Sequence, residues 1–391
     1  MMNNFDFKIG TQIYFGKDRE REIGKILTKY NAKNVLIVIG RKSVIKSGLL
    51  NRVVESIEYE RITYTLLQGV RANPTYDLVL EGNKLVIENK IDFILAIGGG
   101  SVIDTAKCIA VTAYYEGDVK DFNLHKATPR SALPVGVILT ISASGSESST
   151  SCVVQDDETG IKMGFNSELV RPVFAIENPE LTYSVNKEQT AYGIVDILMH
   201  TLERYFSPSE SNELADEFAL GLIKHVIDVG LIAFENPNDY NARARLMLAS
   251  SMSHNGFTSV GKRYFMSVHK LEHAISGKFV NVAHACGLAI LFPGWAEEYY
   301  TYEIDKFARL GEYVFGINNE DKEIEAKLCI DAFRKYFKKL GMPSRLSEIG
   351  IKKQDIDELA DIVTEKGSRA AEHFGHPLDY DTVKEIYLLV Y

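Results

Sequence analysis

Cysteine is scarce in this sequence, and its few cysteines follow no pattern. The 391 residues include Cys108, Cys152, Cys286 and Cys329, and no two of these have the CxxC spacing of a zinc or redox motif. We therefore expect free thiols in a reducing compartment and no disulfide framework. The first residues, MMNNFDFKIG, also lack the basic and apolar segments of a secretory signal. Together these features predict a cytoplasmic protein.

Long apolar runs and blocks of positive charge are also missing. Segments such as FILAIGGG and LAILFPGW are too short and too broken by glycine to span a bilayer. The net charge is −9 with acids and bases interspersed, so no basic face for nucleic acid is expected. The hydrophobic content of 46% is that of a globular protein with a core. We expect neither a membrane nor a nucleic acid as a partner.

The first half of the chain alternates short β-branched runs with segments of helical periodicity. The expected strands are 34–40, 62–70, 91–98, 133–141 and 172–177, and the expected helices are 19–30, 44–57 and 76–89. The pattern of residues 5–15 predicts an exposed edge strand or hairpin, which could also pair across a dimer. Residues 142–165 predict loops with a short hairpin. Strand followed by helix followed by strand indicates a parallel, Rossmann-like sheet.

From Asn186 onwards the pattern is helical almost to the end. The expected helices are 187–206, 212–235, 239–258, 264–278, 283–299, 303–315, 322–341, 353–367 and 380–389. We therefore predict an α/β dinucleotide-binding domain over residues 1–185, followed by an all-helical, metal-binding catalytic domain over residues 186–391.

Three consecutive glycines link a predicted strand to a predicted helix in IGGGSVIDTAK (97–107). Glycines allow close approach of a phosphate, and the N-terminus of a helix offers free N–H groups. The segment is neither GxGxxG nor a P-loop. With Ser101 at the expected N-cap, we interpret it as a pyrophosphate cradle; the alternative is a simple tight turn.

Two other loops follow predicted strands and are expected at the same edge of the sheet. They are TISASGSESS (140–149) and GRKS (40–43). The second contains Arg41 and Lys42 but no acid, and a cation there suits the 2′-phosphate of NADP(H) better than an acid would. This favours NADP(H) over NAD(H), unless both cations are merely solvated surface charges.

One carboxylate and several histidines form the strongest signal. Asp196 and His200 are four residues apart, and so are His269 and His273, so each pair lies on one face of a helix. Either pair alone could arise by chance on a polar face. The set Asp196, His200, His269 and His284 offers one carboxylate and three imidazoles, which suits iron(II) or zinc with a position left open for substrate.

These motifs together resemble the iron-containing (group III) alcohol dehydrogenases. GGGSVIDTAK, the ASGSE of 143–147, and Asp-x3-His followed by HKLEH and a later histidine carry the resemblance, which covers nearly the whole chain. The most similar branch contains butanol dehydrogenases and aldehyde reductases. The fold it implies has the two-domain, dehydroquinate synthase-like architecture.

The resemblance implies specific residue roles. The metal, Fe(2+) with zinc as the alternative, would be held by Asp196, His200, His269 and His284. The cofactor contacts would come from Gly40, Arg41, Lys42, Ser43, Asn73, Gly98, Gly99, Gly100, Ser101, Asp104, Thr140, Ser144, Ser149 and Lys162. His273 would lie near the nicotinamide and relay a proton, or else serve as a packing histidine. The implied enzyme is a homodimer.

The implied activity is NAD(P)(H)-dependent oxidation of short-chain primary alcohols and reduction of aldehydes, with the metal polarising the substrate oxygen. There are two departures from the family pattern: His269 and His284 are fifteen residues apart, one more than expected, and Ala285 replaces a usual glycine. Alternatives are a glycerol dehydrogenase-like enzyme, a dehydroquinate synthase-like lyase and a non-catalytic nucleotide-binding protein.

Overall fold

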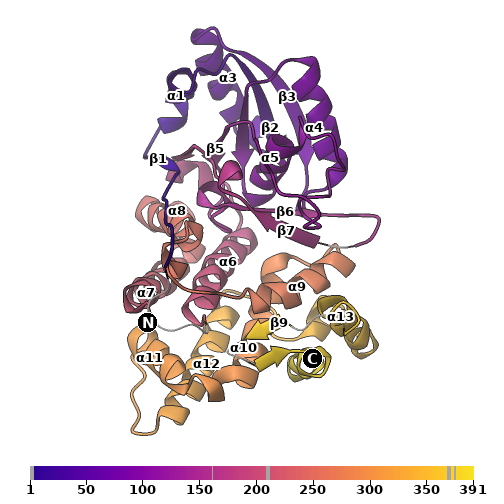
Figure 1. Ribbon diagram of the computed structural model, residues 1–391. Helices are drawn as coiled ribbons and strands as arrows, with labels where there is room; N and C mark the ends of the chain where they lie inside the picture. Colours follow the sequence, from indigo (N-terminus) through magenta and orange to yellow (C-terminus); the bar gives the residue numbers. More distant parts are fainter. Residues whose placement is uncertain (1–3, 161, 208–211, 368–370, 374–375) are drawn as a thin grey trace. The chain divides into compact units, whose positions relative to one another are not determined.

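The chain folds into two compact units. The computed structural model describes residues 4–391 apart from 161, 208–211, 368–370 and 374–375 (Figure 1). One unit is Lys8–Ser184, and the other is Val185–Tyr391 together with residues 4–7. Residues 4–7 were expected in the α/β domain, but they belong to the helical unit. The ring of Phe7 lies 5.8 Å from that of Phe257, which explains why they belong to the helical unit.

The α/β unit is built on a six-stranded sheet with the order β1-β8-β5-β4-β2-β3 and parallel pairing throughout. Its strands are β1 (Gln12–Phe15), β2 (Asn34–Gly40), β3 (Thr63–Val70), β4 (Phe93–Gly98), β5 (Val135–Leu139) and β8 (Phe174–Glu177). The central strands are buried along nearly their whole length, which is why they are continuously apolar. The predicted parallel, Rossmann-like sheet is confirmed.

Helices and one hairpin complete this unit. The helices are α1 (Ile23–Lys29), α2 (Ser43–Lys46), α3 (Leu49–Tyr59), α4 (Tyr76–Glu88) and α5 (Gly100–Thr112), and the antiparallel hairpin is β6 (Ser151–Gln155) with β7 (Lys162–Asn166). Short 3-10 helices lie at Arg19–Glu22, Ser146–Ser148, Glu168–Val170 and Pro179–Thr182.

Two predicted elements of this unit were wrong in extent. The strand predicted over 5–15 is formed only by Gln12–Phe15, which pairs with β8 at the edge of the sheet. The helix predicted over 44–57 is interrupted, because Gly48 has a φ of 71°. This left-handed conformation suits glycine and separates α2 from α3.

The second unit is mainly helical. Its helices are α6 (Lys187–Tyr205), α7 (Glu213–Glu235), α8 (Tyr240–His254), α9 (Ser267–Lys278), α10 (His284–Tyr299), α11 (Ile304–Phe315), α12 (Lys322–Lys339), α13 (Ile356–Val363) and α14 (Tyr380–Leu389). Short 3-10 helices lie at Phe257–Ser259, Tyr300–Tyr302, Leu346–Ile349 and Lys353–Asp355. Among the described residues, no helix is both long and apolar enough to cross a bilayer.

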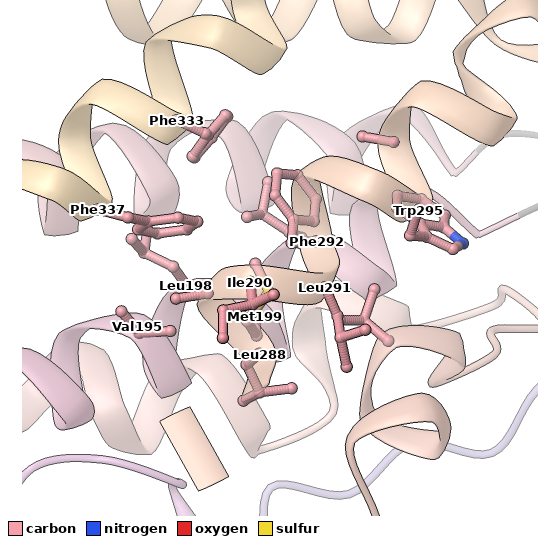
Figure 2. Close-up of a cluster of buried hydrophobic side chains, with 14 of the residues drawn as sticks. Val195, Leu198, Met199, Leu288, Ile290, Leu291, Phe292, Trp295, Phe333 and Phe337 are labelled. Carbon is pink, nitrogen blue, oxygen red and sulfur yellow. The ribbon is translucent and has the colours of Figure 1, made fainter. Parts of the chain in front are cut away.

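Helix α6 lies at the centre of this unit. It packs against α7, α8, α9 and α10, and its apolar side chains join those of α10 and α12 in one core. Figure 2 shows Leu198 and Met199 of α6 beside Leu288 and Ile290 of α10, with Phe333 of α12 in the same cluster. Burying each such side chain contributes about 1.5–3 kcal/mol. Because α6 is enclosed, any polar side chain on it needs a partner.

One feature of the helical unit was not predicted. Strand β9 (Ala371–His373) pairs antiparallel with β10 (His376–Leu378). Strands this short show no readable alternation in a sequence, so periodicity could not indicate them. The unit is therefore helical with one small hairpin.

Candidate metal centre and cofactor-binding loops

Helix α6 places the first two candidate ligands on one buried face. Its N-cap is Asn186, whose side chain accepts a hydrogen bond from the backbone N–H of Gln189 at 2.8 Å. The Oδ1 atom of Asp196 lies 3.5 Å from the Nε2 atom of His200 one turn later. Only 8% of Asp196 and 6% of His200 are exposed.

Helix α9 brings a third side chain to this pair. The Nε2 atom of His269 lies 3.8 Å from Oδ1 of Asp196, and its ring centroid is 4.5 Å from that of His200. His269 is likewise buried. The three groups each offer a ligand atom, and these atoms lie within 4.8 Å of one another. Two helices distant in sequence thus create a convergent set of two nitrogens and one oxygen.

The chemistry of these atoms fits a divalent metal ion. Within the described residues, neither Oδ1 of Asp196 nor Nε2 of His269 has a hydrogen-bond partner, although both atoms are buried. Such atoms are costly unless something satisfies them. Two ligand atoms about 2.1 Å from one ion in a tetrahedral arrangement lie about 3.4 Å apart, close to the separations from Asp196 to the two rings.

The two buried histidines have opposite electrostatic surroundings. Burial, and then the neighbouring His254 and His269, hold the pKa of His200 well below its ordinary value, so its ring is neutral. Burial also opposes a charge on His269, but the carboxylates of Glu203 and Asp196 outweigh this and raise its pKa to about 9. The neutral ring of His200 can bind a cation as it stands, whereas His269 must give up the Nε2 proton when it binds one.

His284 and His273 lie beside this set. The ring of His284 is 5.3 Å from that of His269 and 5.5 Å from that of His273, while His269 and His273 are 6.3 Å apart. Both are partly exposed. Atoms of Glu272, His273 and His284 form a second group of potential ligands. Helix α9 continues to Lys278, so the connection to His284 consists of residues 279–283.

Sequence reasoning missed three neighbours of these histidines. Glu203 contacts the Nδ1 atom of His269, and Glu272 contacts the Nδ1 atom of His284. The ring of His254 stacks on that of His200 at 4.2 Å. Glu203 could have been found, because it follows Asp196 by seven residues and so lies on the same face of α6. No comparable spacing indicates His254.

Cys286 is not among the described residues whose ligand atoms converge here. Burial raises the pKa of its thiol above the ordinary value. A buried thiol with a raised pKa is a poor metal ligand at neutral pH. All four cysteines are buried and free, as the sequence predicted.

In the α/β unit, the glycine loop lies between β4 and α5. A Cβ atom on Gly99 would lie 2.3 Å from Cγ2 of Ile141, and one on Gly100 would lie 2.6 Å from Oγ of Ser144. The glycines are therefore required by close contact with the 140–149 loop. No side chain of the described residues caps α5. The N–H groups of Val102 and Ile103 donate to the Gly99 carbonyl, so Gly100 and Ser101 carry the N–H groups that can bind an outside acceptor such as a phosphate.

The expected position of Ser101 was wrong. Gly99 is the N-cap of α5, and Ser101 lies inside the first turn. The carbonyl oxygen of Ser101 accepts a hydrogen bond from the Thr105 hydroxyl at 2.9 Å. Its own hydroxyl therefore does not act as a cap, although Ser101 still lies at the helix end where a phosphate would bind.

Lys107 ties the two loops together. Its side chain is fully buried, and its ammonium donates to five oxygens of Ser146, Ser149 and Ser151 at 2.7–3.1 Å. Burial lowers the pKa of Lys107 to about 8. The hydroxyl of Ser149 is one of these partners, and Ser149 itself is only 1% exposed. Of the predicted cofactor contacts, Ser149 and Gly98 are buried.

The other predicted cofactor residues lie in the same unit, most of them on loops or at element ends and Asp104 within α5. Asn73 follows β3 in a left-handed conformation with φ 56°, which asparagine tolerates better than most residues. Asp104 accepts hydrogen bonds from the Ser146 hydroxyl at 2.6 Å and from the Val153 N–H at 3.1 Å. Partly exposed positions are Gly40, Thr140, Ser144 and Lys162, and exposed ones are Arg41, Lys42 and Ser43.

Comparisons with known proteins agree with this arrangement. The family described as iron-containing alcohol dehydrogenase matches residues 10–179, and the Fe-containing alcohol dehydrogenase family, C-terminal, matches residues 190–390. NADH-dependent butanol dehydrogenase A of Clostridium acetobutylicum is 39% identical over 92% of each chain. The NADPH-dependent aldehyde reductase YqhD of Escherichia coli is 33% identical over 99% of each chain.

A solved structure of a butanol dehydrogenase is also similar to this chain over its whole length. That of NADH-dependent butanol dehydrogenase A from Thermotoga maritima is 34% identical, with a TM-score of 0.95 over 100% of this chain and 99% of the other. These matches place the chain among the NAD(P)-dependent alcohol dehydrogenases, which are oxidoreductases. The chain belongs to the iron-containing alcohol dehydrogenase family.

Proposed function

We propose that this enzyme interconverts short-chain primary alcohols and aldehydes, with Asp196, His200, His269 and His284 holding an iron(II) ion. The observation that carries the proposal is the buried set of Asp196, His200 and His269, in which two ligand atoms lack any other partner among the described residues. Membership of the family supports NAD(P)H-dependent alcohol dehydrogenase and aldehyde reductase activity. Zinc suits the same donors and is the alternative ion.

When bound, the metal ion supplies a Lewis acid beside the substrate oxygen and the nicotinamide supplies or accepts a hydride. The protein contributes position and charge. Asp196 provides negative charge in a buried setting, and His200 is neutral and so offers a ring nitrogen. His273 is partly exposed and close to His284, and in our proposal it transfers the alcohol proton towards solvent.

The cofactor-binding residues support a preference for NADP(H) over NAD(H). Arg41 and Lys42 are exposed directly after β2, and the carbonyl of Arg41 accepts a hydrogen bond from the Gln68 side chain, which holds the turn. Two exposed cations beside the end of β2 can approach a 2′-phosphate. The named relatives include both NADH- and NADPH-dependent enzymes, so sequence similarity does not decide the preference.

The experiment is a kinetic comparison of NADPH and NADH with butanal and other short aldehydes. We expect a higher kcat/KM with NADPH, and Arg41→Ala combined with Lys42→Ala should reduce that preference. Lys25→Ala removes an exposed cation elsewhere in the same unit and serves as the control. Equal or higher efficiency with NADH in the parent enzyme would refute the preference.

We further propose a homodimer in a reducing compartment such as the cytoplasm. Strand β1 is the terminal strand of the six-stranded sheet in the described residues, and an edge strand of this kind is a site where a second copy can pair. The four buried free cysteines suit reducing conditions. Light scattering of the purified enzyme tests the dimer.

A further inference from the structure

Two buried carboxylates lie behind two of the candidate metal-binding histidines. We propose that Glu203 and Glu272 are positioning residues of the metal centre: each accepts the Nδ1–H of one histidine and so directs the Nε2 atom of that ring towards the ion. Glu203 acts on His269, and Glu272 acts on His284. This inference rests on the metal site of the proposed function.

Glu203 fixes both the ring and the backbone of His269. It lies on α6 and is 1% exposed. One carboxylate oxygen, Oε2, contacts Nδ1 of His269. The other, Oε1, accepts hydrogen bonds from the N–H groups of Val268 at 2.6 Å and of His269 at 3.4 Å, in the first turn of α9. A single side chain thus holds the start of α9 and the orientation of its metal-facing ring.

This contact also selects the tautomer of His269. A carboxylate only accepts hydrogen bonds, so a neutral His269 ring carries its proton on Nδ1 and has the lone pair on Nε2. That Nε2 atom is the one that faces Asp196 Oδ1 at 3.8 Å without a hydrogen-bond partner among the described residues. A carboxylate behind a metal-binding histidine acts in this way in many metal sites.

Glu272 has the same relation to His284. Its side chain is fully buried, whereas that of His284 is 25% exposed, and Oε2 contacts Nδ1 of His284 at the first residue of α10. Ser276 donates a further hydrogen bond to the same oxygen at 3.3 Å. A Cβ atom on Gly287 would lie 2.6 Å from Cγ of Glu272, so α10 leaves room for this carboxylate.

The charge of these residues points to a cation. A carboxylate that is buried beside a histidine carries a large desolvation cost, which a nearby divalent ion offsets. His284 is the most exposed of the four candidate ligands, so it depends most on an outside contact to hold one orientation. We therefore expect Glu272 to matter for metal retention although it does not face the Asp196 cluster.

The test is the affinity of the full-length enzyme for cobalt(II), measured by competition with a chelator. Glu203→Ala and Glu272→Ala should weaken cobalt binding by about 10- to 100-fold. Glu203→Gln and Glu272→Gln keep an acceptor for the Nδ1–H but lose the charge, so they should weaken binding less. The visible spectrum of bound cobalt should change in the alanine variants. Thermal unfolding of the metal-free proteins checks that each variant folds, which matters most for Glu203 because it also holds α9.

Glu325→Gln is the matched control. Glu325 is 1% exposed, lies on α12 of the same unit and accepts a hydrogen bond from the Asn319 N–H at 2.7 Å. Its replacement should leave cobalt affinity unchanged.

Parent-like affinity in both alanine variants would overturn the inference and leave the proposed function intact. Complete loss of cobalt in Glu272→Gln would also overturn it, because Glu272 would then be a ligand. A parent enzyme that reduces aldehydes and binds no divalent metal would refute the proposed metal dependence, and this inference with it.

Discussion

His269 uses both of its ring nitrogens, which makes it the most informative single residue of the metal centre. Nδ1 contacts Glu203, and Nε2 faces Asp196. His269→Ala should therefore remove both bound metal and activity, the latter by more than about 100-fold, because losing a ligand costs more than losing the partner behind it. Elemental analysis and aldehyde reduction measure the two effects. His225→Ala, on α7, should retain both. Full activity without metal in His269→Ala would contradict the assignment.

His273 separates a proton-transfer role from a metal-binding one. It is four residues after His269, but its ring centroid lies 6.3 Å from that of His269. His273→Ala should keep the metal and lower kcat by about 100-fold, the lower range of general acid–base contributions. Metal content and kcat, measured on one preparation, decide the matter. Loss of metal would show that His273 is a ligand.

Contacts between side chains on different helices are the part of the site that the sequence did not predict. Spacing of four placed Asp196 beside His200, and the structure brings His269 to them from another helix. That Glu203 and Glu272 contact the outer ring nitrogens depends on packing between helices, which no spacing rule within one helix supplies. His254 stacks on His200 for the same reason.

At the scale of elements, the junction of β4 and α5 depends on glycine. Gly99→Ala would place a methyl group 2.3 Å from Cγ2 of Ile141 and push the two cofactor loops apart. We expect the KM for the nicotinamide cofactor to rise by about 10-fold, equivalent to about 1.4 kcal/mol and within the usual cost of overpacking. Metal content should not change, since the metal-binding residues belong to the other unit.

Gly221→Ala is the control for that variant. Gly221 lies within α7, and nothing would contact an added Cβ within 4 Å. This change should leave the cofactor KM unchanged and stabilise the protein by about 0.5–1 kcal/mol, because alanine favours a helix interior. If both variants had the same KM as the parent, the close contact at Gly99 would have no role in cofactor binding.

The Lys107 anchor predicts a dependence of stability on pH. Burial lowers the pKa of Lys107 to about 8 in the folded state, from 10.5. The folded state therefore binds fewer protons than the unfolded state between these values, so its stability rises with pH there. Burying the charged ammonium lowers the free energy of unfolding. This cost is present in full below pH 8 and falls by about 3 kcal/mol in total as the pH approaches 10.5. The free energies of unfolding of the parent and of Lys107→Met can be measured with urea across this pH range. That of the parent should rise relative to that of Lys107→Met as the pH increases. Parallel curves would contradict the low pKa.

Element boundaries followed the sequence where periodicity was long and failed where single residues decided them. Helices α6 and α10 lie within a residue or so of the predicted ranges, because long periodic patterns and an Asn186 cap define them. The interruption at Gly48 and the N-cap at Gly99 depend on local backbone conformation. The hairpin of β9 and β10 is too short to show a period.

At the scale of the whole molecule, the fold and the family were predictable because several independent motifs agree. The glycine loop belongs to one unit and the histidine cluster to the other, so each could be recognised separately in the sequence. The substrate and the choice between NADP(H) and NAD(H) stay predictions, since they depend on the detailed surroundings of a few side chains such as Arg41.

The central claim is that the Asp196–His200–His269 cluster holds the metal on which dehydrogenase activity depends. Its most direct test is elemental analysis of anaerobically purified enzyme, combined with NADPH-dependent reduction of butanal before and after chelation. We predict iron bound in the parent enzyme, loss of activity with loss of iron, and recovery when iron(II) is restored. Undiminished butanal reduction by a metal-free enzyme would contradict the claim.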